Sequence, residues 1–151
     1  RTKPRYLFNP GPYTSVPYDW GGGDSIAQFN SLMAQNLQAG DIELSPYGEF
    51  CSRGVDCSGF MTNIWGMTNG HLGTGQLPDI STSVALAELQ RGDLFNKVNV
   101  HSAMFKEATW SGLVTVYEST TYNNVDRVFT GSYNWSRFNG YLTSKYKNVC
   151  P

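Results

Sequence analysis

The chain has few charged residues and no long apolar run. Asp, Glu, Lys and Arg make up 15% of the 151 residues, and the formal net charge is -1. Proteins that hold nucleic acid or an acidic membrane surface by charge carry a basic excess, so neither partner is expected here. No stretch approaches the roughly 20 apolar residues that a membrane-spanning helix needs, so membrane insertion is not expected.

Potential metal ligands are also scarce. The chain has two histidines, and neither they nor the three cysteines have the paired spacing of a zinc site. No glycine-rich loop follows a predicted strand in the way that phosphate binding requires. We therefore expect neither a metal nor a cofactor. Aromatic residues are abundant at 14%, and with 16 glycines and seven prolines they favour strands and shaped loops over a helical bundle.

The three cysteines cannot all pair within one chain, so at least one is unpaired. If Cys57 is a free thiol, Cys51 and Cys150 remain for a disulfide. That bridge would close a loop of about 100 residues and contribute roughly 4.7 kcal/mol in the chain-entropy model. Disulfides persist in oxidising compartments, so a secreted, extracellular protein is expected. The alternative is three unrelated thiols in a cytosolic protein.

Apolar spacing predicts helices in the first part of the chain and strands in the second. The expected helices cover residues 26–37, a stretch beginning near Asp56 or Cys57, and residues 81–89. The expected strands cover residues 93–96, 100–106 and 113–119, and less strongly 125–130 and 141–146. Asp24 or Ser25 can cap the first helix. This order is typical of an α+β fold with an antiparallel sheet, here one domain over residues 1–151 with an extended lead-in over residues 1–16.

The segment Asp56-Cys57-Ser58-Gly59-Phe60 places a cysteine at the start of a predicted helix. A thiol there lies at the positive end of the helix dipole, which favours the thiolate, the nucleophilic form. Acyl transfer through Cys57 is therefore one interpretation, and a buried structural cysteine is the alternative.

A cysteine nucleophile needs a base, and histidine titrates near neutrality. His101 opens an apolar strand, whereas His71 lies in a turn and is expected to be exposed to solvent. The base needs an acceptor for its second ring nitrogen. Glu118 on the following strand is the leading candidate, and Asn123 and Asn124 are weaker ones.

Acyl transfer also needs hydrogen-bond donors for the developing oxyanion. The backbone N–H of Cys57 is one natural donor, and the hydroxyl of Tyr18 is a second candidate. Asp56 and Ser58 flank the nucleophile, so both are expected to line the oxyanion and substrate-binding region.

Four segments carry recognisable motifs in a fixed order. They are Pro17-Tyr18-Asp19-Trp20-Gly21-Gly22, Val55-Asp56-Cys57-Ser58-Gly59-Phe60, Leu89-Gln90-Arg91-Gly92-Asp93-Leu94 and His101-Ser102-Ala103-Met104-Phe105. They resemble the Pro-Tyr-x-Trp-Gly-Gly, Phe-Asp-Cys-Ser-Gly-Phe/Leu, Leu-x-Pro-Gly-Asp-Leu and His-Val-Gly-Ile-Tyr motifs of the NlpC-type cell-wall cysteine peptidases, which belong to the papain-like superfamily. With the strand that carries Glu118, the resemblance covers about two thirds of the chain, residues 17–120.

The resemblance implies a papain-like fold in which N-terminal helices pack on an antiparallel sheet. It implies that Cys57 is the nucleophile, that His101 is the base and that Tyr18 lines the site near the oxyanion. Glu118 falls at the family's third polar position, which is commonly His, Asn or Gln. The segment between Gly23 and Val55 is longer than in the family core, and Arg91 stands where the family has Pro.

The function implied is hydrolysis of amide bonds in bacterial peptidoglycan stem peptides, at a D-glutamyl–diamino-acid bond. The protein would act as a monomer on peptidoglycan or its peptide fragments. One alternative is an N-acetylmuramoyl-L-alanine amidase, which cuts between sugar and peptide. The other is a secreted binding or toxin-like module that keeps the fold without catalysis.

Overall fold

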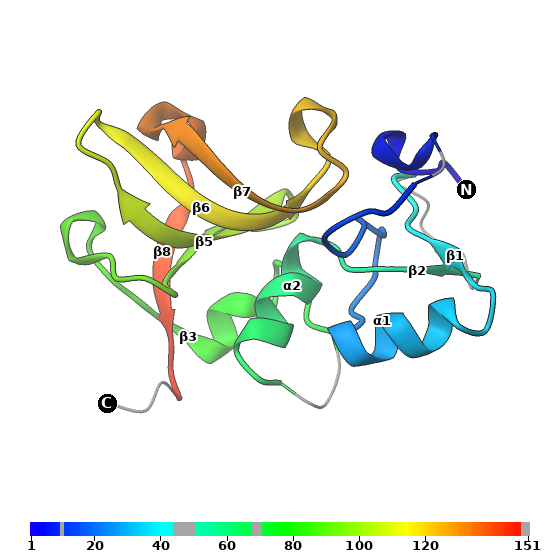
Figure 1. Ribbon diagram of the computed structural model, residues 1–151. Coiled ribbons are helices and arrows are strands. Elements are labelled where there is room, and N and C mark those ends of the chain that lie inside the picture. The colour runs from blue at the N-terminus through cyan, green and yellow to red at the C-terminus, as the bar shows by residue number, and fades with distance from the viewer. Residues whose placement is uncertain (10, 44–50, 68–70, 149–151) are drawn as a thin grey trace. The chain divides into compact units, whose positions relative to one another are not determined.

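The computed structural model describes residues 1–9, 11–43, 51–67 and 71–148. Within them the protein is an α+β protein with two α-helices and a six-stranded antiparallel sheet (Figure 1). The helices are α1 (Ile26–Met33) and α2 (Cys57–Ile64). The strands are β1 (Gln38–Ala39), β2 (Ser52–Arg53), β3 (Ser81–Ser83), β4 (Leu94–Lys97), β5 (His101–Ala108), β6 (Leu113–Thr120), β7 (Arg127–Asn134) and β8 (Leu142–Tyr146). The predicted α+β class and the antiparallel sheet are confirmed.

The chain divides into two compact units. The first unit comprises Arg1–His71 and Ser119–Phe129, and the second comprises Leu72–Glu118 and Thr130–Pro151. Both α-helices belong to the first unit, and most of the six-stranded sheet belongs to the second. Neither helix among the described residues has the length and apolar content that crossing a membrane requires.

In the first unit, α1 begins at Ile26 because Ser25 caps it. The Ser25 hydroxyl accepts the Gln28 N–H at 3.3 Å, and the Gln28 side chain accepts the Ser25 N–H at 2.9 Å, which completes a capping box. The helix ends at Met33, earlier than the predicted residue 37. Asn36 takes a left-handed conformation with φ of 62°, which a continuing helix does not allow.

Two parts of the first unit add to the elements that the sequence predicts. Ser52–Arg53, outside the predicted helices and strands, form β2, which pairs in parallel with β1. The lead-in, which is expected to be extended, includes a 3-10 turn, Arg5–Leu7. The Arg5 guanidinium there forms an ion pair with Asp126, which is fully buried.

In the second unit, the strands of the sheet lie in the order β3-β8-β4-β5-β6-β7, and Figure 1 shows β5, β6 and β7 side by side. All five strands expected after residue 92 are present, with shifted ends. The helix predicted over residues 81–89 is wrong. Residues Ser81–Ser83 form β3, which pairs with β8, and only a 3-10 turn, Leu86–Glu88, follows. Pairing with a strand about sixty residues away overrides the local pattern.

Aromatic and small aliphatic side chains form the core of the second unit. Its buried members are Phe95, Ala103, Phe105, Val114, Val116 and Phe138. The rings of Phe95 and Phe138 stack with their centroids 4.4 Å apart. Because side chains alternate along a strand, His101 continues the core face of β5 beyond Ala103, and Glu118 continues that of β6 beyond Val116. The fold thus places two polar residues at the edge of an apolar core.

Candidate active site

Cys57 is the first residue of α2, and it is 7% exposed. The helix begins there because the Asp56 carboxylate accepts the Gly59 N–H at 2.7 Å, so Asp56 acts as the N-cap. The predicted helix start near Asp56 or Cys57 is therefore confirmed. The thiol lies in the first turn, where unpaired N–H groups give the helix its positive end.

The Asp56 carboxylate has four hydrogen-bond partners in the described part of the chain. Its Oδ1 atom accepts from the Gly59 N–H and from the Ser58 hydroxyl at 3.1 Å, and it lies 3.0 Å from the Nε2 atom of His71. Its Oδ2 atom accepts the Gly21 N–H at 3.2 Å. These hydrogen bonds fix the side chain of Asp56, which directly precedes Cys57 in the chain.

The two glycine-containing motifs of the first unit pack backbone against backbone. The Asp56 N–H donates to the Gly22 carbonyl at 2.9 Å. A Cβ atom on Gly59 would lie 2.2 Å from that same carbonyl oxygen, so no larger residue fits at position 59 without a shift. This close approach explains why glycine follows Cys57-Ser58. A Cβ atom on Gly22 would in turn lie 2.7 Å from the Gly54 carbonyl oxygen, so glycine is required there as well.

Tyr18 belongs to the same cluster. It is 5% exposed, and its backbone bridges to Val55. Burial raises the pKa of the Tyr18 hydroxyl well above its usual range, and the negative charges of Cys57 as thiolate and of Asp56 raise it further. The hydroxyl therefore keeps its proton and can act as a hydrogen-bond donor.

His71 is a member of this cluster that the sequence interpretation missed. Its side chain is 27% exposed, and its Nε2 atom lies 3.0 Å from Asp56 Oδ1 and 3.1 Å from Ser58 Oγ. The hydrogen bond to Asp56 raises the pKa of His71 although burial opposes the change. The only sequence signal was a histidine shortly after a helix that begins with a carboxylate.

In the second unit, the imidazole of His101 is bonded to a buried carboxylate. The Nε2 atom of His101 lies 2.6 Å from Glu118 Oε2, and the Arg137 guanidinium donates to the same oxygen at 2.9 Å. The side chains of Glu118, His101 and Arg137 are 0%, 14% and 15% exposed. The sequence predicted the first two residues as partners, and the structure brings them together.

The electrostatics favour an ionised Glu118. Burial opposes ionisation, but hydrogen bonds from His101 and Tyr133 and the positive charge of Arg137 outweigh it, so the pKa of Glu118 lies below its ordinary value. Because the imidazole binds the carboxylate through Nε2, this contact fixes the orientation of the ring.

Arg137 was not predicted. It lies in the 3-10 turn Trp135–Phe138, and its guanidinium stacks 4.3 Å from the centroid of the Tyr133 ring. An arginine among aromatic residues was the only local signal. The weaker candidates Asn123 and Asn124 lie in the first unit with positive φ, and Asn124 accepts a hydrogen bond from Arg5.

The predicted disulfide stays a prediction. Cys51 is exposed, and Cys150 lies outside the described residues. Within the described ranges, no group of three or more His, Cys, Asp or Glu side chains is arranged to hold a metal ion.

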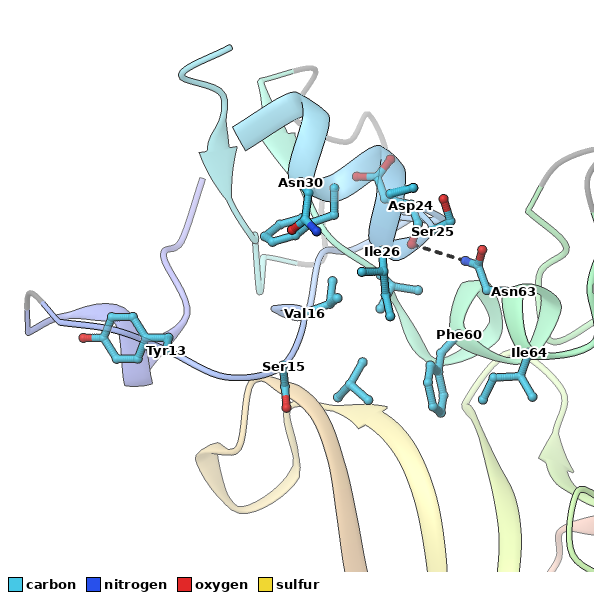
Figure 2. A pocket seen from close by; sticks show the side chains of 14 residues that line it. Tyr13, Ser15, Val16, Asp24, Ser25, Ile26, Asn30, Phe60, Asn63 and Ile64 are labelled. Atoms are coloured by element: carbon cyan, nitrogen blue, oxygen red, sulfur yellow. Dashed lines mark hydrogen bonds between the residues drawn. The ribbon is translucent and has the colours of Figure 1, made fainter. Parts of the chain in front are cut away.

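The first unit also contains a cavity of about 790 Å³ between α1, α2 and the segment before Tyr18. Figure 2 shows Val16, Ile26 and Phe60 around it, and the side-chain amide of Asn63 donating to the Asp24 carbonyl at 3.3 Å. Ile26 and Ile64, which also line it, are 71% and 47% exposed. Apolar side chains therefore line a cavity that solvent reaches.

Comparison of the chain with protein-family models, with curated proteins and with solved structures finds no match. The predicted site residues Tyr18, Asp56, Cys57 and Ser58 belong to the first unit, and His101 and Glu118 belong to the second.

Proposed function

We propose that the protein is a papain-like cysteine hydrolase that cleaves amide bonds in bacterial peptidoglycan stem peptides. The observation that carries the proposal is the buried His101–Glu118 pair, with Nε2 and Oε2 2.6 Å apart. An imidazole fixed by an ionised carboxylate is the arrangement by which cysteine and serine hydrolases prepare a base. The cysteine at the start of α2 supplies the nucleophile that such a base requires.

In the proposed reaction, the Nδ1 atom of His101 takes the thiol proton, and the Cys57 sulfur attacks the carbonyl carbon of the amide. The oxyanion accepts hydrogen bonds from the Cys57 N–H and the Tyr18 hydroxyl. As the C–N bond breaks, the imidazolium returns the proton to the leaving amine and an acyl-enzyme remains. Water, deprotonated by His101, then attacks the thioester and releases the acid and the thiol.

The substrate class follows from the motif resemblance, which points to the D-glutamyl–diamino-acid bond. The test is mass spectrometry of soluble disaccharide-peptide fragments after incubation with the protein. The proposal predicts products cut within the peptide. Release of an intact peptide from the sugar would instead identify the amidase alternative, and no product in either position would contradict hydrolysis of these fragments.

A second candidate function, binding of an apolar ligand, is favoured by the cavity between α1 and α2. Its volume of about 790 Å³ lies in the range of small-molecule sites. No residue of α1 is buried, and its apolar residues Ile26, Ala27 and Phe29 line the cavity. The acidic side chain in the lining is Asp24, which accepts the Gly54 N–H at 3.1 Å and lies 3.8 Å from Arg53. A ligand with an apolar body and no negative charge fits this lining.

Binding is tested with N-phenyl-1-naphthylamine, an uncharged probe that fluoresces in apolar sites. We expect saturable binding that Ile64→Asn weakens about fivefold, which corresponds to about 1 kcal/mol. Val98→Asn is the matched control, because Val98 is 43% exposed in the second unit and Ile64 is 47% exposed. Absence of saturable binding, or equal weakening by both variants, would exclude this site.

A further inference from the structure

We propose that His71 is a positioning residue for the reaction of Cys57. As a cation it neutralises the Asp56 carboxylate beside the thiol and so permits the thiolate to form at neutral pH. The inference rests on the proposed function, because it takes Cys57 to be the reacting group. It assigns a role to a histidine outside the motifs that the sequence analysis singled out.

The geometry gives His71 a distinct place among the partners of Asp56. Two of the four hydrogen bonds to this carboxylate within the described residues come from the backbone N–H groups of Gly21 and Gly59, and a third comes from the Ser58 hydroxyl. All three donors are neutral. The fourth partner is the His71 Nε2 atom, 3.0 Å from Oδ1, which carries a full positive charge when protonated. One of the hydrogen-bond partners of Asp56, protonated His71, can therefore balance its negative charge.

Asp56 directly precedes Cys57 in the chain, and a neighbouring carboxylate disfavours a developing thiolate by like-charge repulsion. The positive end of α2 opposes the repulsion, and a cation beside Asp56 would oppose it further. A protonated His71 makes the Asp56–His71 pair neutral overall and removes most of the repulsion. Hydrogen bonding to Asp56 raises the pKa of His71, so the ring stays protonated further toward neutral pH.

The other titratable groups in the cluster do not supply a positive charge. Tyr18 stays neutral because burial raises its pKa, and Asp19, whose pKa burial raises to about 6, becomes negative as pH rises. Arg53 lies against Asp24 at 3.8 Å. Loss of the His71 proton therefore leaves the negative charge of Asp56 without a cationic hydrogen-bond partner. Among the described residues that hydrogen-bond to Asp56, His71 is the one that can carry a positive charge.

The test separates the charge of His71 from its hydrogen bond. His71→Gln can keep a hydrogen bond to Asp56 without the charge, whereas His71→Arg keeps the charge. The cavity of about 380 Å³ that His71 lines gives room for the longer side chain. Met67→Gln is the matched control, because it places the same side chain at another residue that lines this cavity and leaves the hydrogen-bond partners of Asp56 unchanged.

The measurement is the rate of Cys57 alkylation by iodoacetamide from pH 5 to pH 9, with circular dichroism of each variant to verify folding. We expect His71→Gln to slow alkylation at pH 6 about fivefold, as a loss of about 1 kcal/mol of charge stabilisation would. His71→Arg should keep the wild-type rate at pH 6, and Met67→Gln should lie close to wild type.

Wild-type behaviour of His71→Gln together with slow alkylation of His71→Arg would show that only the hydrogen bond matters and would overturn the inference. Equal profiles for all four proteins would overturn it as well. A wild-type Cys57 that is no more reactive than an unfolded thiol is a different result, because it contradicts the proposed function itself. If His71→Gln does not fold, the His71→Arg profile still decides: a wild-type rate at pH 6 supports a role for the charge, and slow alkylation overturns the inference.

Discussion

Replacing Glu118 by alanine is expected to lower the free energy of unfolding by about 3–5 kcal/mol, the range for removing one partner of a buried ion pair. The Glu118 side chain is 0% exposed, and the side chains of His101 and Arg137 are 14% and 15% exposed. Without the carboxylate, the largely buried Arg137 guanidinium would lose this counter-charge, and the His101 Nε2 atom would lose its hydrogen bond to Glu118. The loss should therefore far exceed that of a surface charge.

Urea unfolding followed by far-UV circular dichroism measures this loss. Glu107→Ala is the matched control, since Glu107 lies on the neighbouring strand with its side chain 46% exposed and ion pairs at 3.2 and 3.9 Å. Exposed ion pairs contribute about 0–1 kcal/mol, so this variant should stay close to wild type. Similar losses of unfolding free energy in the two variants would show that the Glu118 carboxylate stabilises the second unit no more than an exposed carboxylate does.

The His101–Glu118 pair also predicts the direction in which the free energy of unfolding changes with pH. Because the folded-state pKa of Glu118 is lowered from 4.5, its ionised form contributes stability above that value, and the contribution is lost as pH falls through the folded-state pKa. The difference in free energy of unfolding between wild type and Glu118→Gln should therefore become smaller in acid. A difference that grows below pH 4.5 would contradict the stated direction of the pKa shift.

The second large effect concerns catalysis. His101→Ala is expected to lower kcat/KM by about 10²–10⁴-fold, the usual contribution of a positioned general base. Glu118→Gln should cost much less, because the glutamine carbonyl can still accept a hydrogen bond from His101 Nε2 and orient the ring. What it removes is the negative charge that stabilises the imidazolium.

Steady-state cleavage of a peptidoglycan fragment by the two variants measures the difference, with Glu107→Gln as a control on the neighbouring strand. Equal loss in His101→Ala and Glu118→Gln would mean that the charge of Glu118 is as essential as the base. Wild-type activity in Glu118→Gln would remove Glu118 from the site.

Features encoded by short-range signals could be predicted from the sequence. The start of α2 follows from a capping carboxylate at Asp56 before an apolar pattern, and the partnership of His101 and Glu118 follows from alternation along two strands that are neighbours in the chain. The hairpin that joins these strands fixes which side chains share a face. Local chemistry was sufficient in each case.

Features set by distant pairing could not be predicted. A short helix was expected where β3 forms, and the pairing of β3 with β8 explains the difference. β1 pairs with β2, although neither segment has the sequence pattern of a strand. Arg137 reaches Glu118 from a turn nineteen positions further along the chain. The partnership of His71 with Asp56 depends on the path of the chain after α2, which no local signal specifies.

The reactivity of Cys57 tests the central claim most directly. The native protein is treated with iodoacetamide from pH 4 to pH 9, the modified cysteine is located by peptide mass, and the same protein unfolded in urea supplies the reference rate for Cys57. Free thiols have a pKa of about 8.5, so an ordinary cysteine reacts slowly at pH 6. We predict that native Cys57 reacts faster at pH 6 than it does in the unfolded chain. Slower reaction in the native protein at every pH would contradict an activated nucleophile and leave binding as the function to pursue.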